Sequence, residues 1–376
     1  MSSNEKSEIF VDYYGKKQPV DQLPNRTIRF NINYMLGYGH SAGVYPAKAY
    51  IINNSYETIS LSYKKDKVVK LFIDVDENKI NQIINEYELM KRAPHLGTKK
   101  PVILGEGKNR QCILIMNRLP GSELVDLVNQ DIIRHLSINK KFELISKLFL
   151  AYYYQVYKAN LVHRDIKPEN IMVQITPVIE VNFCDYGLAK PKENSHDKLC
   201  CGTPNYVAPE VFYGDGHTSL SDLFSLARII TLILTSDSRY FNIPVDNSNY
   251  AVEQSQTASQ KVDEMLSHAN TPFEFNALIK SMLNPEPRKR PDIVDAINQF
   301  YTIFPQLRPP ALQHSEIGEE HHVECLSIQK HWSNNTHSFF GSSTKTETDD
   351  FRRLFEKDLK TKGIIPIIAQ DKKMVI

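Results

Sequence analysis

The sequence has no excess of either charge, no pattern of paired cysteines and no long apolar run. Its 376 residues carry 45 Lys and Arg against 44 Asp and Glu, a net charge of +1, which argues against a protein that coats nucleic acid or binds membranes through a polybasic surface. The five cysteines form no CxxC, so neither a disulfide framework nor a zinc ribbon is indicated. No stretch approaches the roughly 20 apolar residues of a membrane span, and residues 1–17 lack the apolar core of a signal peptide. We therefore expect a soluble, cytoplasmic protein that binds no nucleic acid.

The first part of the chain has the pattern of β-strands. Apolar residues make up 41% and charged residues 24% of the sequence, which suits a buried core in one large or two ordinary domains. Residues 1–27 are polar and are interpreted as a tail or a peripheral strap. From residue 28 apolar and polar residues alternate, and a second β region over 44–73 is interrupted at Asn53 and Asn54, where we expect a hairpin turn.

Helical patterns follow further along the chain. Residues 76–93 have apolar residues at helical spacing, which are Ile80, Ile83, Ile84, Tyr87 and Met90. The short apolar runs PVIL and CILIM then indicate two strands. Residues 140–160 and 221–234 are too long and too apolar for surface strands and predict buried helices. The pattern predicts a small β-rich lobe followed by a larger helical lobe.

The C-terminal extension, residues 305–376, is polar again and contains one well-specified amphipathic helix at about 348–362. Thr348 can serve as its N-cap and Gly363 suits a left-handed cap. The apolar face is formed by Phe351, Leu354, Phe355 and Leu359. It needs a partner, either the main domain or another protein. Nearby, Cys325 and three histidines fit no standard zinc spacing, so we interpret them as structural rather than as ligands.

The segment HRDIKPEN, from His163 to Asn170, carries the clearest chemistry. It places a carboxylate (Asp165), a cation (Lys167) and an amide (Asn170) in one loop after a buried helix. Asp165 could accept a proton from an attacking hydroxyl, Lys167 could neutralise charge on a transferring phosphoryl group, and Asn170 could offer an oxygen to a hard cation. A polar loop with a proline turn is the alternative, but a chance match over eight residues is very improbable.

This segment resembles the catalytic loop of eukaryotic-type protein kinases. Fifteen residues past Asn170, Asp185-Tyr186-Gly187 resembles the DFG motif, which implies that Asp185 and Asn170 hold magnesium. The Tyr186 hydroxyl, absent from phenylalanine, needs a hydrogen-bond partner. CGTPNYVAPE, at 201–210, is similar to the end of the activation segment.

The resemblance covers about residues 28–304 and implies a two-lobed α+β fold. The antiparallel β-rich N-lobe would span about 28–117 and the α-helical C-lobe about 120–304.

Three further residues resemble structural braces of this family. Glu210, in the APE motif, would be a buried carboxylate that needs a cation, and Arg290 occupies the place of the family's late arginine. Asp222 resembles the helix aspartate that holds the backbone of the catalytic loop. These residues separate protein kinases from distant relatives.

In the N-lobe, residues 37–44 (GYGHSAGV) resemble the glycine-rich loop, with Gly37, Gly39 and Val44 at the nucleotide, although a simple turn is the alternative. Pro46 just beyond suggests a sheet edge or a bulge. Lys70, in KVVKLF, is preferred as the phosphate-binding lysine over Lys64, Lys65 and Lys67, which lie in a more polar stretch. The long gap before Lys70 indicates an inserted hairpin around 51–65.

The partner of Lys70 is expected on the following helix. Glu86, sixteen residues on, is preferred because Leu89 and Met90 then follow at the spacing expected from the resemblance. Glu88, the alternative, would point to a different face. Residues 113–124 (ILIMNRLPGSEL) resemble the segment that joins the lobes. The resemblance places Met116 behind the adenine pocket, the backbone from Asn117 to Leu119 at the adenine edge, and Glu123 near the ribose.

The resemblance implies transfer of the γ-phosphoryl group of ATP, with Mg²⁺, to serine or threonine hydroxyls of a protein substrate. Lys167 and Thr203 resemble the serine/threonine branch, in which this threonine bridges Asp165 and Lys167. Two rivals are a pseudokinase that binds nucleotide without turnover and a small-molecule phosphotransferase of related fold. The intact motifs argue against the first rival, and the APE segment with its braces argues against the second. The richness in Asn, Ile and Lys would also suit a bacterial effector delivered into a host cell.

Regulation is expected not to need a phosphate. Arg164 is the residue that in many kinases grips a phosphate on the activation segment. Ser195 is the only hydroxyl between Leu188 and Gly202, and Leu199 occupies the usual phosphorylated position. We expect a carboxylate of the segment, Glu193 or Asp197, to approach Arg164 in place of a phosphate.

Overall fold

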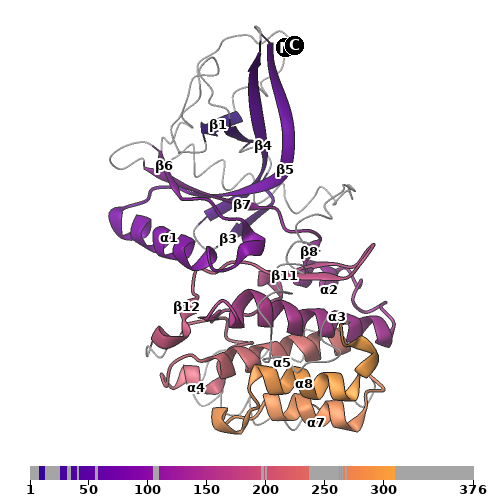
Figure 1. Cartoon of the computed structure of the whole chain (residues 1–376). Helices are drawn as coiled ribbons and strands as arrows, with labels where there is room; N and C mark the ends of the chain where they lie inside the picture. Colours follow the sequence, from indigo (N-terminus) through magenta and orange to yellow (C-terminus); the bar gives the residue numbers. More distant parts are fainter. Residues whose placement is uncertain are drawn as a thin grey trace. The chain divides into compact units, whose positions relative to one another are not determined.

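The structure is a computed structural model, and two compact units are recognised in it (Figure 1). It describes residues 8–12, 26–31, 35–39, 42–55, 58–104, 110–195, 199, 201–236, 262, 264, 266 and 269–309. Unit 1 comprises Met1–Lys91, Leu96–Arg118 and Asn335–Ile376; unit 2 comprises Arg92–His95 and Leu119–Asn334. The predicted C-terminal helix at 348–362, the histidines near Cys325, and Asp197 lie outside the described residues.

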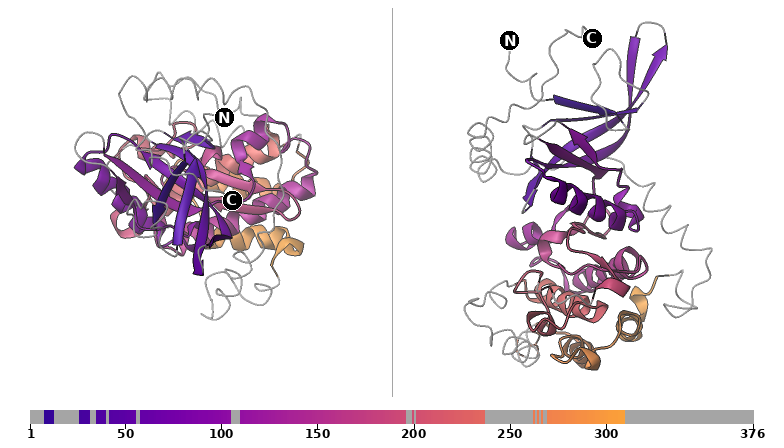
Figure 2. Two further views of the ribbon diagram at one scale, coloured as in Figure 1. Left: turned by 90° about the horizontal axis from the view of Figure 1, so that it is seen from above. Right: turned by 90° about the vertical axis from the view of Figure 1, so that its left-hand side faces the viewer.

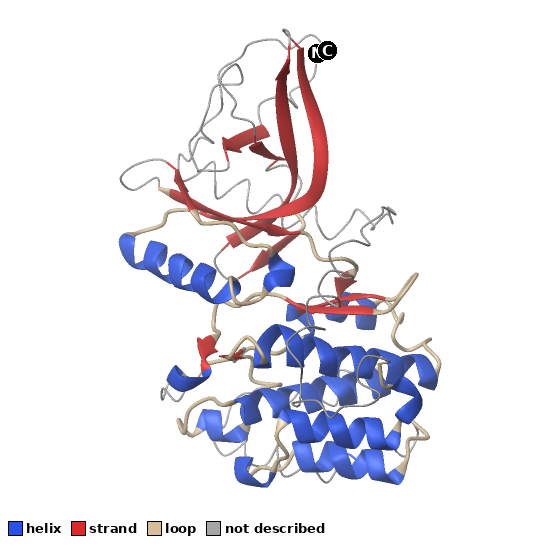
Figure 3. Ribbon diagram, in the orientation of Figure 1, coloured by secondary structure: helices blue, strands red, loops and turns tan. Residues whose placement is uncertain are grey.

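Unit 1 is built on an antiparallel sheet with the order β1-β2-β4-β5-β7-β6, and β3 pairs with β4 (Figure 3). The strands are β1 (Glu8–Asp12), β2 (Arg26–Asn31), β3 (Gly37–Gly39), β4 (Ala42–Ser55), β5 (Thr58–Phe72), β6 (Val102–Leu104) and β7 (Gln111–Asn117). Helix α1 (Glu77–Met90) follows β5.

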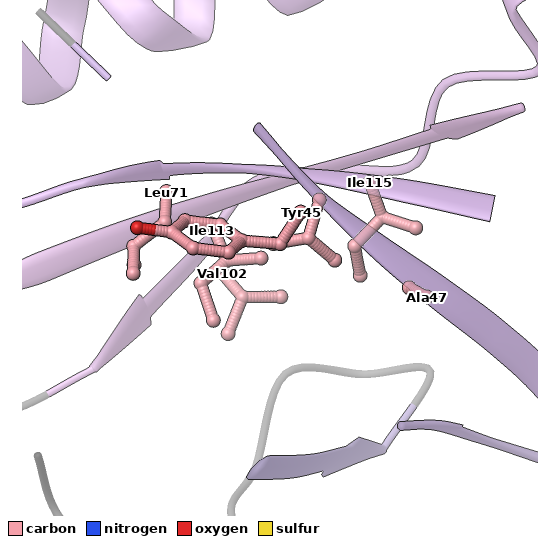
Figure 4. Close-up of a cluster of buried hydrophobic side chains, with 7 residues drawn as sticks. Tyr45, Ala47, Leu71, Val102, Ile113 and Ile115 are labelled. Carbon is pink, nitrogen blue, oxygen red and sulfur yellow. The ribbon is translucent and has the colours of Figure 1, made fainter. Parts of the chain in front are cut away.

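The core of unit 1 lies on one face of this sheet (Figure 4). Side chains of a strand point alternately to its two faces, so alternate residues of three neighbouring strands meet there. They are Tyr45 and Ala47 of β4, Val69 and Leu71 of β5, and Ile113 and Ile115 of β7, with Val102 of β6. The intervening residues of β5 and β7 therefore point to the opposite face of the sheet. Helix α1 contacts β7 on that face.

Helix α1 begins at a side-chain cap and buries one stripe. The Asp76 carboxylate accepts a hydrogen bond from the Lys79 backbone N–H at 2.7 Å, which satisfies one of the free donors of the first turn. The buried residues are Ile80, Ile83, Glu86 and Met90. The predicted helix is confirmed, but Ile84 is 38% exposed and lies outside this stripe.

Unit 2 is mainly helical, with small sheets of the order β11-β10-β8 and β12-β9. Its strands are β8 (Ser122–Glu123), β9 (Leu161–Val162), β10 (Ile171–Gln174), β11 (Glu180–Phe183) and β12 (Lys190–Pro191). Its helices are α2 (Leu124–Asn129), α3 (Ile138–Tyr152), α4 (Pro209–Phe212), α5 (Ser219–Thr235), α7 (Phe273–Met282) and α8 (Ile293–Ile303). A π-helical turn, Tyr153–Tyr157, continues α3.

The two predicted buried helices are confirmed as α3 and α5, which pack against each other and against α8, while α7 packs on α5 and α8 (Figure 2). Helix α5 is buried on all sides from Ser221 to Leu234. It ends at Ser236, whose φ of 53° is left-handed. The buried ammonium of Lys141 donates to the Leu234 carbonyl at 2.9 Å, so a cation satisfies the negative end of this helix.

Three local expectations in unit 1 need correction. Residues 8–12, assigned to a polar tail or strap, form edge strand β1. Asn53 and Asn54 are paired with Ser60 and Ile59, so they lie inside the inserted hairpin rather than at its turn. The bulge lies between Ala49 and Tyr50, not at Pro46.

Pro46 is tolerated in an inner strand for a different reason. The stretch of β4 paired with β3 ends at Val44, and the stretch paired with β2 begins at Ala47. Pro46 therefore lies where β4 has no strand partner on one side among the described residues, so its missing N–H breaks no ladder bond there.

No helix in the described part of the chain is long and apolar enough to cross a membrane.

Candidate active site

The loop from His163 to Asn170 connects β9 to β10, and three polar side chains contact Asp165 within it. Asp165 Oδ1 accepts a hydrogen bond from Thr203 Oγ1 at 2.8 Å. Its Oδ2 accepts from Asn170 Nδ2 at 3.0 Å and lies 3.1 Å from Lys167 Nζ. Three side chains from two segments of the chain thus fix the orientation of one carboxylate, and the predicted contact of Thr203 with Asp165 is confirmed.

Asp222 of α5 forms hydrogen bonds with the backbone of this loop. Its carboxylate accepts from the backbone N–H of His163 at 2.7 Å and of Arg164 at 3.0 Å. Arg164 has a left-handed φ of 70°, a strained conformation for a non-glycine residue that these bonds help to hold. Tyr152 also donates to Asp222, at 3.0 Å. Burial raises the pKa of Tyr152 well above its ordinary value, so the hydroxyl remains a donor.

The DYG segment follows β11 and carries an exposed carboxylate next to a buried ring. Asp185 is exposed and has a φ of 57°. Tyr186 is fully buried, its ring lies 5.0 Å from that of His163, and its hydroxyl donates to the Gln155 carbonyl at 3.2 Å. The partner that the extra hydroxyl was expected to need is therefore present.

Asp185 and Asn170 fit the donor set of a magnesium ion. Mg²⁺ prefers oxygen ligands and is commonly bound by one or two protein groups together with substrate phosphates. Asp185 supplies a carboxylate, and Asn170 uses Nδ2 on Asp165, so its Oδ1 is the atom suited to a cation. The Cys184 backbone N–H donates to the Asn170 carbonyl at 3.0 Å, which ties the two loops together. Elsewhere in the described chain no group of three or more His, Cys, Asp or Glu residues could hold a metal.

The segment after Asp185 is tied to the helical core by a buried ion pair. Arg290 NH1 and NH2 donate to the two carboxylate oxygens of Glu210 at 2.7 and 2.8 Å. Ser221 Oγ also donates to Glu210, at 2.8 Å. The predicted pairing of Glu210 with Arg290 is confirmed.

The stretch 203–207 beside Asp165 is fixed by α5. Ser225 Oγ donates to the Tyr206 carbonyl at 2.8 Å, and Arg228 Nε donates to the Asn205 carbonyl at 3.1 Å. The backbone around Thr203 is therefore held by the same helix whose Asp222 holds the catalytic loop.

In unit 1, Lys70 of β5 forms an ion pair with Glu86 of α1 at 2.9 Å. Their side chains are 14% and 8% exposed, so water screens the pair only weakly. Glu88, the alternative partner, is exposed and pairs with Lys91. The predicted pairing of Lys70 with Glu86 is therefore confirmed. Lys67, one of the alternative lysines, donates to Asn117 instead.

The glycine-rich stretch lies on β3 and β4. Gly37 pairs with Val44 and Gly39 with Ala42, and residues 40–41 lie outside the described part. Val44 in turn pairs with Lys70. A Cβ at Gly43 would lie within 3.0 Å of the Tyr45 ring, so packing alone requires the third glycine of this stretch.

The family model for the Protein kinase domain matches residues 30–302. The chain belongs to the protein kinase domain family. The predicted α+β fold, with an antiparallel β-rich N-terminal lobe and a helical C-terminal lobe, is confirmed by this match and by the two units.

Relatives of this kinase domain include two serine/threonine-protein kinases. The chain is 28% identical over 221 residues to serine/threonine-protein kinase CG17528 of Drosophila melanogaster, an alignment of 57% of this chain and 27% of the fly protein. It is 29% identical over 193 residues to the probable serine/threonine-protein kinase PLK of Dictyostelium discoideum, covering 48% of this chain and 19% of that protein. The chain spans about a fifth to a quarter of the length of these relatives.

The predicted nucleotide residues of the kinase domain divide between the units. The residues Gly37, Gly39, Val44, Lys70, Glu86, Met116 and Asn117 belong to unit 1. Leu119 and Glu123 belong to unit 2, so the boundary falls within the predicted lobe-joining segment. Burial raises the pKa of Glu123 to about 7, and Asp126 and Glu169 add to the rise. Its role at the ribose stays a prediction.

Sequence reasoning missed Gln155. This buried residue of the π-helical turn bonds Asn182 through Nε2 at 3.1 Å and accepts from the Phe183 backbone N–H at 2.8 Å. Together with the bond from Tyr186 to its carbonyl, it holds the strand that leads to Asp185. The available signal was a glutamine inside an otherwise apolar and aromatic helix.

Proposed function

We propose that this kinase domain transfers the γ-phosphoryl group of ATP to serine or threonine hydroxyls of protein substrates. The observation that carries the proposal is the set of contacts at Asp165, whose two oxygens are held by Thr203, Asn170 and Lys167. A carboxylate held in this way presents a fixed acceptor to an incoming hydroxyl. The two relatives described above are named as serine/threonine-protein kinases, which supports the choice of acceptor.

The proton of the attacking hydroxyl is proposed to move to Asp165 Oδ1. Oδ1 accepts one hydrogen bond, from Thr203, whereas Oδ2 is approached by both Asn170 and Lys167. A carboxylate has about four lone-pair sites, so Oδ1 keeps one for the substrate. The hydroxyl oxygen then bonds the γ-phosphorus, the bond to the bridging oxygen breaks, and ADP leaves.

Lys167 and Lys70 are proposed to hold the negative charge of the nucleotide and of the transferring group. Lys167 lies 3.1 Å from Asp165 and is partly exposed, so its ammonium is at the place where the acceptor and the phosphoryl group would meet. Lys70 is fixed by Glu86, which leaves further N–H donors for phosphate oxygens. Magnesium, held by Asp185 and Asn170, would neutralise charge on the phosphates.

The proposed nucleotide site also includes the glycine-rich stretch and the segment that joins the units. Gly37 and Gly39 offer backbone that can approach phosphates closely, and Val44 pairs with Lys70. Met116 is proposed behind the adenine, the backbone from Asn117 to Leu119 at its edge, and Glu123 at the ribose. We place the reaction in the cytoplasm, of its own cell or of a host cell. The five cysteines of the sequence, which form no CxxC, are consistent with that compartment.

The test is transfer from radiolabelled ATP to generic protein substrates and, in parallel, to free small molecules. We expect label on serine and threonine of the protein and none on the small molecules. Asp165→Asn should abolish transfer while nucleotide affinity stays largely intact, because Asp165 orients the acceptor. Asp131→Asn, at an exposed position of the same unit, is the matched control and should retain activity.

Two results would overturn the proposal. Nucleotide binding without transfer to any substrate would indicate a pseudokinase, and label only on small molecules would indicate a phosphotransferase of related fold. A parallel loss of ATP affinity and rate in Asp165→Asn would contradict the role of Asp165.

A further inference from the structure

We propose that Lys67 and Gly97 are positioning residues that clamp Asn117 and thereby fix the end of β7 for adenine binding. The clamp lies on the face of the sheet opposite to Lys70. The inference deepens the proposed function, because it rests on the backbone after Met116 binding the adenine edge.

The first half of the clamp is a cross-strand pair. Lys67 of β5 and Asn117 of β7 are direct partners in the antiparallel register. The Lys67 ammonium donates to Asn117 Oδ1 at 2.5 Å. Lys67 is only 6% exposed, although lysine is almost never buried without a partner. Because burying a charge is costly, the ammonium constrains the amide that accepts its bond.

The second half is the close approach of Gly97. Gly97 has a φ of 51°, a left-handed conformation that glycine adopts without strain. A Cβ at this position would lie 2.7 Å from Asn117 Cγ, so the bare Cα is what makes room for the amide. Two residues on, the Lys99 backbone N–H donates to the Ile115 carbonyl at 2.8 Å. The loop is therefore attached to β7 immediately before the clamped residue.

The alternation of the strands shows which part of Asn117 the clamp leaves available. Asn117 shares a strand face with Ile113 and Ile115, which point into the core of unit 1 (Figure 4). Met116 points to the opposite face, as does Lys70, which pairs there with Glu86. A nucleotide that contacts Lys70 would meet the backbone of β7 and not the Asn117 side chain. The clamp therefore lies on the face of the sheet opposite to the one that would bind the nucleotide.

This arrangement gives Lys67 a role different from phosphate binding. Lys67 and Lys70 are three residues apart on one strand, so they lie on opposite faces. Lys70 is held by a carboxylate on the helix side, and Lys67 by an amide at the end of the neighbouring strand. Lys67 therefore acts on the nucleotide through the position of Asn117.

The experiment measures the Kd of a fluorescent ATP analogue for the full chain and for six variants. Lys67→Met and Asn117→Leu should each weaken binding roughly 3- to 30-fold, and the double variant should lose no more than the worse single one. Asn117→Asp keeps an acceptor for the ammonium and should bind nearly as well as wild type. Lys100→Met, at an exposed position of the same loop, is the matched control and should change nothing.

Two further readouts separate positioning from a general loss of structure. The KM for ATP should rise in the Lys67 and Asn117 variants while the KM for a protein substrate stays constant. Gly97→Ala, which pushes a methyl group against the Asn117 amide, should weaken nucleotide binding in the same way. If Lys67→Met does not fold, the comparison of Asn117→Asp with Asn117→Leu decides.

Binding by Lys67→Met and Asn117→Leu within about twofold of a nucleotide-binding wild type would overturn the inference alone, as would additive losses in the double variant. Equal losses in Asn117→Asp and Asn117→Leu would also overturn it. A wild-type chain that binds no nucleotide would overturn the proposed function, and the inference with it.

Discussion

Replacing Arg290 with methionine should destabilise the helical unit strongly. The Arg290 guanidinium is fully buried, and Glu210 is 8% exposed. Besides its two bonds to Glu210, Arg290 donates through NH1 to the Leu220 carbonyl at 2.9 Å and through Nε to the Asn284 carbonyl at 2.7 Å. Methionine fills most of the volume but leaves the Glu210 carboxylate buried with only Ser221 as a donor.

The expected magnitude follows from that stranded charge. Removing one partner of a buried ion pair costs about 3–5 kcal/mol. Total stability of a typical domain is about 5–15 kcal/mol, so a large share of it would be lost. For a unit of this size, that loss corresponds to a fall in Tm of roughly 6–20 °C.

Thermal unfolding followed by far-UV circular dichroism provides the measurement. Lys289→Met is the matched control, because Lys289 is 60% exposed and forms an exposed pair with Glu286; exposed pairs contribute at most about 1 kcal/mol. Adding Glu210→Gln to Arg290→Met removes the stranded charge and should recover part of the loss. A fall in Tm for Arg290→Met no greater than that for Lys289→Met would refute the reasoning.

Four other outcomes are expected. Lys70→Met and Glu86→Gln should each lower kcat, and the double variant should lose much less than the sum, since the pair acts as a unit; additive losses would mean that they act separately. Asp185→Asn should remove the carboxylate charge that would hold magnesium and abolish transfer without lowering Tm, and substantial residual transfer would contradict the assignment. Phosphatase treatment and Ser195→Ala should leave activity intact, because the Ser195 side chain is buried and donates to Lys192; loss of activity in both would indicate a phospho-switch. The pKa of Glu123 is raised from 4.5 to about 7, so its contribution to stability is lost as the pH rises through 7. Glu123→Gln should therefore be more stable than wild type at pH 8 and equally stable below pH 4.5. Denaturation midpoints that are equal for the two proteins at both pH values would contradict the raised pKa of Glu123.

The sequence predicted those parts of the kinase domain whose signals are local. The catalytic loop and the segment around Glu210 are contiguous matches, and the apolar helices α3 and α5 are recognisable without tertiary information. The pairing of Lys70 with Glu86 was predictable because the resemblance to protein kinases implies a lysine on this strand and a glutamate on the helix that follows it. In each case a short stretch carries enough chemistry to define the contact.

Contacts that depend on strand register or on loop packing were not predictable. The partnership of Lys67 with Asn117 joins residues 50 positions apart, and only the alignment of β5 with β7 brings them together. The position of Pro46, between the stretch of β4 paired with β3 and the stretch paired with β2, likewise depends on strand register. A one-residue change of register would reverse the face of every side chain, and the amino-acid pattern alone does not fix it.

At the start of the activation segment, the carboxylate of Glu193 has a different partner from the one expected. Glu193 was expected to approach Arg164 in place of a phosphate. Instead its carboxylate accepts a hydrogen bond from Asn160 Nδ2 at 2.9 Å, so that expectation is wrong for Glu193. The carbonyl of Asn160 also accepts from the Lys192 backbone N–H at 3.1 Å, which holds the segment against the end of the π-helical turn.

Two further contacts extend this attachment along the segment. The Lys192 ammonium lies 3.2 Å from the centre of the Tyr157 ring, a cation–π arrangement, and burial lowers the lysine pKa. The His217 backbone N–H donates to the Ser195 carbonyl at 3.2 Å. None of these contacts contains a phosphate or needs one. Each is lost if the segment leaves its place, so together they favour the ordered segment. We therefore expect activity without phosphorylation from the contacts to Tyr157, Asn160 and His217. The expected approach of Asp197 to Arg164 lies outside the described residues and stays a prediction.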